Sequence, residues 1–387
     1  MRFADIIGQQ AIKEQLTELV HHNRLSHALL FIGKEGNGAL PLAIAFAQYM
    51  VCERSHGPLA MSHEPDSCGA CPACMKAEQL AHPDIHYSYP TVTKKPGEKP
   101  KATDFIAEWR EFIKLNPYGN SFDWIEQIKE KENSQGKITS AECDDIIRKL
   151  SLKSFESVYK VLVLWMPEEL EKEGNKLLKI IEEPPPNTLF ILVTENAELM
   201  LPTIVSRCQL IRIPALDDIE IEQALINRNK TEPVIARQIA GVSEGNYREA
   251  MQLVQHAEED WQSLLREWLN AILKTGPVSQ AKWVEEISRL GREKQKQFLR
   301  YFNHLLGQAI RQRIVGSGQW AVSKGSEQDF AERLNKIAGI EQQQAILEEL
   351  DKASYYIERN ANAKMLFHAL TIKLYHIIQD KIVFLAE

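Results

Sequence analysis

The N-terminal half of the chain alternates short apolar runs with segments of helical periodicity. Residues 28–32 form an apolar run, and residues 39–51 mix alanines with large apolar side chains, as in a helix packed on a sheet. Apolar runs at residues 159–164 and 189–194 predict buried strands, and a helical segment between them stops at three consecutive prolines. This alternation predicts an α/β fold with a parallel sheet.

Beyond Asp217 the pattern changes from strands to helices. Residues 261–273 and 298–306 each place large apolar side chains along one helical face. We therefore expect the C-terminal half to be a helical assembly. Because 387 residues exceed what one hydrophobic core usually organises, two or three domains are expected.

Composition narrows the function without naming it. The formal charge of −7 predicts no strong autonomous binding to nucleic-acid backbone, so any DNA contact should be shared with partners. No apolar run approaches the roughly 18 residues of a membrane span. The first five residues lack the charged and apolar regions of a secretory signal. We expect a cytoplasmic protein with no membrane contact.

A glycine loop follows the first predicted strand. A working phosphate loop needs glycines for close backbone approach, a lysine for the outer phosphates and a Ser or Thr hydroxyl for magnesium. Ala39 and Leu40 stand where the lysine and the hydroxyl residue belong. Three glycines keep the spacing of such a loop: Gly33, Gly36 and Gly38.

The second half of an ATPase site is usually an apolar strand that ends in Asp and Glu. Here the strand at residues 161–164 runs into Trp165 and Met166. Either loss alone would disable hydrolysis, so the sequence predicts a degenerate site that hydrolyses no ATP. A glycine turn that joins a strand to a helix is the favoured interpretation of the loop, and we assign no nucleotide to it.

Four of the six cysteines lie in one early segment. Cys68, Cys71 and Cys74 are separated by two residues each, and Cys52 follows the end of the preceding predicted helix. Four thiolates in this pattern favour a closed tetrahedral zinc site with a structural role. The alternatives are an iron–sulfur site, free thiols, or replacement of Cys52 by one of three histidines otherwise expected on the surface: His56, His63 and His82.

One arginine lies at a strand junction. Residues 202–208 lead from the strand that ends at Thr194 into another apolar strand at residues 210–213. An arginine supplied in trans accelerates some nucleotide hydrolases by about 10³ to 10⁵. The residues alone favour a solvated or salt-bridged surface role for Arg207, and a finger role needs further context.

These motifs occur together and in the order of one family. The glycine loop, the four cysteines, the His-Pro-Asp motif at 82–84, residues 175–185 and the Ser-Arg-Cys motif at 206–208 resemble the delta-prime clamp-loader subunits of bacterial DNA polymerase III. The similarity is clearest over residues 1–74 and 138–213. A long gap between Cys52 and Cys68 and an extra segment near residues 91–136 depart from the better-known pattern.

The resemblance implies a RecA-like AAA+ parallel-sheet module with a zinc insertion, followed by an all-α lid and an all-α collar. We expect the module at residues 1–213, the lid at 214–257 and the collar at 258–387. The zinc insertion lies near residues 52–74. Arg248 resembles the lid arginine that senses nucleotide in active relatives, and packing or a salt bridge is the alternative role for it.

The family's site residues carry over to matching positions. The resemblance implies that Cys52, Cys68, Cys71 and Cys74 bind zinc. It also implies that Arg207, flanked by Ser206 and Cys208, is the arginine finger for an adjacent ATPase subunit. Implied partners are the ATPase motor subunits and the delta subunit of a hetero-oligomeric ring, with the sliding clamp and primed DNA reached through the assembly. Two other functions stay open: a self-sufficient AAA+ ATPase motor subunit and a zinc-dependent nucleic-acid-binding module that uses the basic loop at 94–101.

Overall fold

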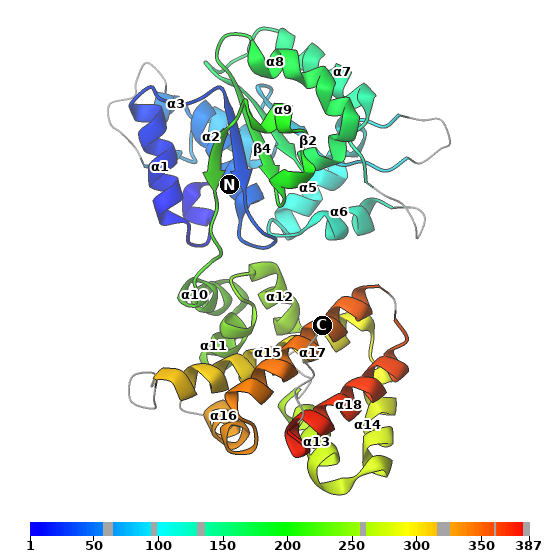
Figure 1. Ribbon diagram of the computed structural model, residues 1–387. Coiled ribbons are helices and arrows are strands. Elements are labelled where there is room, and N and C mark those ends of the chain that lie inside the picture. Colours follow the sequence, from blue (N-terminus) through cyan, green and yellow to red (C-terminus); the bar gives the residue numbers. More distant parts are fainter. Residues whose placement is uncertain are drawn as a thin grey trace. The chain divides into compact units, whose positions relative to one another are not determined.

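The computed structural model describes residues 1–56, 65–93, 99–129, 136–255, 261–315, 326–359 and 361–381 (Figure 1). Contacts divide the chain into two units, Met1–Gln252 and Leu253–Glu387. Hydrophobic clusters of described residues lie within each unit. None of the helices in these ranges is long and apolar enough to span a membrane.

A five-stranded parallel sheet forms the centre of the first unit (Figure 1). Its strand order is β2-β3-β4-β1-β5, and each neighbouring pair is parallel. Parallel neighbours require crossover connections, which here are largely helical. The strands are β1 (Ala28–Ile32), β2 (Ile85–Ser88), β3 (Lys160–Trp165), β4 (Thr188–Thr194) and β5 (Gln209–Arg212).

The parallel α/β sheet predicted from the apolar runs is confirmed. Four strands lie within one residue of their predicted ends, and the predicted helix at 39–51 is α2 (Ala39–Val51). The exception is β2, an edge strand of only four residues. Its sequence, Ile-His-Tyr-Ser, contains no continuous apolar run, whereas β5, an edge strand of the same length, contains Leu210 and Ile211 side by side.

Alternating side chains of the strands enter two separate cores. Phe31 and Ile191 belong to the core on one face, whereas Leu30 and Leu192 belong to the core on the other. Helices on the first face are η1 (Phe3–Asp5), α1 (Gln10–His21), α2, α4 (Pro72–Glu78), η2 (Ala102–Phe105), α5 (Ile106–Leu115) and α6 (Ser121–Ile128). Those on the second are α7 (Ser140–Ser151), η3 (Pro167–Leu177), α8 (Leu178–Glu182) and α9 (Pro202–Val205).

A helical segment follows the sheet in the first unit. Asp217 begins it with a capping box, in which the Glu220 carboxylate accepts the Asp217 N–H at 3.0 Å. Its helices are α10 (Asp218–Asn229), α11 (Pro233–Val242) and α12 (Tyr247–Gln255), and the unit boundary falls within α12 after Gln252. We call α10 to α12 the lid. Two short helices remain in this unit, α3 (Glu53–His56) and η4 (Ala197–Leu199).

The second unit consists of helices in its described residues, as the sequence predicts. Trp268 and Trp283 stack in its core with ring centroids 4.5 Å apart, and the Trp268 Nε1–H donates to Thr371 Oγ1 at 3.0 Å. The elements are α13 (Trp261–Asn270), the π-helical turn η5 (Ala271–Thr275), α14 (Pro277–Arg289), α15 (Arg292–Val315), α16 (Ser326–Ile337), α17 (Ile340–Glu358) and α18 (Ala363–Gln379).

We expect Trp268→Ala to destabilise the second unit by about 3–5 kcal/mol, because it opens a cavity beside Trp283 and removes the indole donor to the Thr371 hydroxyl. Urea unfolding followed by circular dichroism measures the change. Met365→Ala, at a side chain 74% exposed, is the control and should stay within about 0.5 kcal/mol of wild type. Equal effects of the two substitutions would contradict this core.

Candidate functional site

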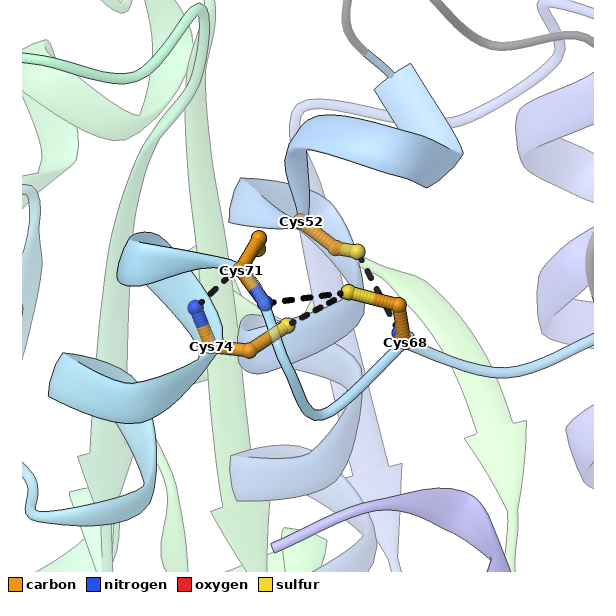
Figure 2. Close-up of side chains that lie close together, drawn as sticks. All are labelled: Cys52, Cys68, Cys71 and Cys74. Carbon is orange, nitrogen blue, oxygen red and sulfur yellow. Dashed lines mark hydrogen bonds between the residues drawn. The ribbon is translucent and has the colours of Figure 1, made fainter.

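Four cysteine sulfurs meet at the end of α2 (Figure 2). Cys52 is the C-cap of α2, Cys71 is the N-cap of α4 and Cys74 lies in the first turn of α4. All four sulfurs lie within 4.8 Å of one another, and the Sγ atoms of Cys68 and Cys74 are 3.9 Å apart. Tetrahedral zinc with Zn–S bonds of about 2.3 Å places its sulfurs about 3.8 Å apart. The donor set and its spacing therefore fit zinc.

Backbone donors support negative charge on these sulfurs. The amides of Cys68, Cys71 and Cys74 donate to the sulfurs of Cys52, Cys68 and Cys71 respectively, each at 3.4 Å (Figure 2). A hydrogen bond from the Cys74 thiol lowers the pKa of Cys52 to about 3, and the same bond, with burial, raises the pKa of Cys74. Four adjacent thiolates require a cation to offset their repulsion.

The predicted alternative ligand His82 lies elsewhere. The four cysteines form the one metal-type cluster among the described residues. The expectation of a surface position is wrong for His82, which is buried: its Nδ1 accepts the Asp84 N–H at 3.1 Å and its Nε2 lies 3.2 Å from Glu156. The side chain of His56 and all of His63 fall outside the described residues.

The aspartate of the His-Pro-Asp motif organises the loop before β3. The buried Asp84 carboxylate accepts the backbone N–H groups of Phe155, Glu156 and Ser157 at 2.6, 2.8 and 2.8 Å. Nothing in the sequence pattern indicates this role, because its partners are backbone groups about 70 residues away along the chain.

We expect Cys71→Ser to lower bound zinc from about one ion per chain and to lower the melting temperature by about 5 °C or more. The physical reason is that three remaining thiolates hold a structural ion less tightly and leave the loop before α4 unsupported. Elemental analysis and thermal unfolding of the purified protein provide the measurements. Cys208→Ser, outside the cluster, is the matched control; zinc retained in full by Cys71→Ser would refute the assignment.

The glycine loop keeps the backbone of a phosphate loop. It follows β1, Gly36 and Gly38 have φ of +71° and +92°, and α2 begins directly after Gly38. Positive φ is the region that favours glycine. Ala39 and Leu40, at the positions of the lysine and the hydroxyl residue, are buried in the apolar core at 7% and 5% exposure.

The chain's own groups occupy the interior of this loop. The Asn37 amide donates to the Ile213 carbonyl at 2.8 Å, and its Oδ1 accepts the Ala39 N–H at 3.1 Å. A Cβ at Gly33 would lie 2.3 Å from the Asn37 side chain. An amide at the start of α2, of the kind that would face a phosphate, is thus already capped.

Aromatic packing replaces the acidic end of the second ATPase motif. Trp165 and Met166 are buried where Asp and Glu are expected. The Trp165 ring contacts Trp109 and Phe112, with centroids 5.5 and 5.9 Å away. Both partners come from α5 in the extra segment, so the segment without a recognisable motif covers this half of the site.

The extra segment is closed at its base, and its aromatic rings pack into the core on the first face of the sheet. Thr91 and Lys137 exchange two backbone hydrogen bonds of 2.9 and 3.0 Å. Trp124 is fully buried and its Nε1–H donates to the Pro90 carbonyl at 2.7 Å. The ring of Trp109 stacks on Tyr89 at 4.0 Å, and Trp109 and Trp124 meet edge to face at 5.3 Å.

The lid arginine, Arg248, lies beside the glycine loop and binds two carboxylates. The Arg248 guanidinium donates from Nη1 to Glu35 at 2.8 Å and from Nη2 to Asp123 at 2.6 Å. Glu35 belongs to the glycine loop and Asp123 to α6 of the extra segment. The sequence indicates neither acidic partner, because the three residues lie far apart along the chain.

Arg207 follows α9 and is half-buried. Its Nε and Nη2 groups donate to the Glu182 carboxylate at 3.3 and 3.1 Å, and its Nη1 donates to the Thr203 carbonyl at 2.9 Å. The salt-bridged arrangement expected from the residues alone is present in this chain. Of the flanking residues, Ser206 is exposed and Cys208 is half-buried.

Comparison with known proteins places the chain in a family. The family model described as "DNA polymerase III, delta subunit" matches residues 8–217, more than half of the chain. The chain belongs to this family. The resemblance to delta-prime subunits of DNA polymerase III that the motifs predict is confirmed, and the predicted parallel α/β module followed by helices is present in the structure.

Relatives of this DNA polymerase III family show moderate identity. The delta-prime subunit of Bacillus subtilis is 28% identical over 65% of this chain and 60% of its own length. The Escherichia coli delta-prime subunit is 26% identical over 51% and 45%, and the Bacillus subtilis tau subunit is 27% identical over 72% and 41%. The chain thus spans about 60% or less of these relatives. Among solved structures, a gamma subunit-related protein of Thermotoga maritima aligns over 94% of this chain and 98% of that chain, with 14% identity and a TM-score of 0.38.

Proposed function

We propose that this chain is a non-catalytic subunit of a DNA polymerase III clamp loader, which scaffolds the ring and supplies Arg207 to the ATPase site of a neighbouring subunit. Its partners would be ATPase motor subunits and a delta subunit, and the assembly would load a sliding clamp on primed DNA. The proposal rests on one observation above all: a glycine loop whose catalytic positions are buried apolar residues lies in the same module as a partly exposed arginine.

The direction of the strands supports a role in trans. The glycine loop follows the carboxyl end of β1, whereas Arg207 precedes the amino end of β5, which runs parallel to β1. The glycine loop and Arg207 therefore lie at opposite ends of the parallel strands. An arginine at the amino edge cannot serve a nucleotide at its own glycine loop, but it is available to another chain.

The ion pair of Arg207 is compatible with release to a phosphate. Its side chain is 32% exposed and that of Glu182 is 58% exposed. Pairs this exposed contribute about 0–1 kcal/mol, so exchange for a nucleotide phosphate costs little. A guanidinium also binds phosphate oxygens through paired hydrogen bonds.

Zinc would have a structural role in this protein. Cys52, Cys68, Cys71 and Cys74 would hold the ion, and its chemistry would be to neutralise four thiolates and tie α2 to α4. Four sulfur ligands leave no position for a reactive water. Within the proposal we keep the division into a module at 1–213, a lid at 214–257 and a collar at 258–387, and a cytoplasmic location.

We expect Arg207→Ala to lower ATP hydrolysis by the reconstituted clamp loader, with clamp and primed DNA present, by about tenfold or more. Arg207→Lys should fail to restore the rate, because an ammonium lacks the paired donors. Arg212→Ala, at an exposed arginine at the end of β5, is the matched control. Unchanged hydrolysis with the ring intact by gel filtration would remove the finger from the proposal.

We also expect no ATP turnover by the isolated chain, and none after Ala39→Lys and Leu40→Thr together. Those substitutions restore the missing residue types in the loop, but Trp165 and Met166 still stand in place of the second motif. A coupled assay of purified protein tests this. Turnover in the wild-type chain that vanishes with Gly38→Val would instead favour a self-sufficient ATPase.

A further inference from the structure

The extra segment, residues 91–136, touches each part of the former nucleotide site. Trp109 and Phe112 cover Trp165 at the end of β3. A Cβ at Gly38 would lie 3.0 Å from the Tyr118 ring, which places that ring against the last glycine of the loop. Asp123 binds the lid through Arg248. One segment thus joins the loop, the strand end and the lid.

The lid contacts the loop through backbone as well as side chains. The Tyr247 N–H donates to the Gly36 carbonyl at 3.1 Å. A Cβ at Gly36 would collide with the Asn246 side chain, at 1.8 Å. The Tyr247 ring meets Tyr118 edge to face at 5.0 Å, and the Tyr118 hydroxyl accepts the Ile7 N–H at 2.8 Å. We call these contacts among the lid, the glycine loop and the extra segment the seam, and they surround the ion pairs of Arg248.

Both carboxylates of the seam are held in place by neighbours other than Arg248. The Asn120 amide donates to Glu35 at 3.0 Å, and the Asn116 amide donates to Asp123 at 3.2 Å. Asp123 also closes a capping box with Asn120 at the start of α6. Glu35 and Asp123 therefore form an acidic receptor for Arg248 that is already held in place. Because these carboxylates are ordered by other contacts, pairing with Arg248 costs less conformational entropy.

The two carboxylates that bind Arg248 have the same sign of charge as a nucleotide phosphate. A nucleotide would present anionic phosphate oxygens to the lid arginine, and here two carboxylates present anionic oxygens to the same guanidinium. The Arg248 side chain is only 12% exposed, so losing these partners would leave a poorly solvated charge. Glu35 and Asp123 together outnumber the single charge of Arg248, so this guanidinium has no charge left to attract a triphosphate.

We propose that the extra segment replaces the nucleotide: Asp123, together with Glu35, holds the lid against the module whether or not ATP is present. In this chain the lid position is then constant, whereas a lid arginine that binds phosphate follows the nucleotide state. The inference goes beyond the proposed function and does not depend on Arg207.

Hydrogen–deuterium exchange of the full chain tests the proposal in α12. Asp123→Asn and Arg248→Gln should each accelerate exchange of the α12 amides by about tenfold or more, because each breaks the same part-buried pair. The double variant should exchange no faster than Arg248→Gln alone. Wild-type exchange should be unchanged when Mg²⁺ and ATP are added.

Glu126→Gln is the matched control, since Glu126 lies on the same helix α6 but pairs with Lys129. It should leave α12 within about twofold of wild type. The proposal would be overturned if the accelerations of α12 exchange in the two single variants multiply in the double variant. It would also be overturned if neither single variant changes α12 exchange, or if ATP slows exchange in the wild-type chain. Exchange of the β4 amides reports whether a variant is folded. Should Asp123→Asn unfold through its lost cap, the Arg248→Gln and ATP measurements decide.

Discussion

A parallel sheet sends the carboxyl ends of all its strands to one edge, and this constraint orders the rest of the first unit. The glycine loop after β1 and Trp165 at the end of β3 meet at that edge because β1, β4 and β3 pair in register. The connection that carries Arg207 reaches the opposite edge for the same reason. The glycine loop and Arg207 therefore lie at opposite ends of the parallel strands. The two can change independently.

Apolar and acidic side chains occupy the region of the glycine loop in place of catalytic residues. Ala39 and Leu40 joined the core, Trp165 became part of an aromatic cluster, and carboxylates from two separate segments surround Arg248. Simple loss of a lysine would leave a hollow lined with unsatisfied amides, which is costly in a folded protein. The substitutions instead satisfy the backbone and fill the space.

Sequence patterns predicted the sheet, the α2 helix and the clustering of the four cysteines, because each depends on local spacing. Strand ends came within one residue where the sequence contains a continuous apolar run, and β2 was missed because His86 and Ser88 interrupt its two apolar positions. The partners of Asp84, Arg248 and Trp165 could not be predicted, since those contacts join residues brought together only by the fold. His82 was wrongly expected on the surface, because burial of a polar ring depends on partners such as the Asp84 amide.

The two backbone hydrogen bonds between Thr91 and Lys137 have a consequence for the connections of the sheet. They bring the entry and exit of a long excursion to the same point, so the path of the chain through β2 and β3 is the same whatever lies between. Lengthening a loop whose ends are already joined costs little conformational entropy, since the closure term grows only with the logarithm of length. A segment inserted between Thr91 and Lys137 therefore leaves the strand connections of the sheet unchanged.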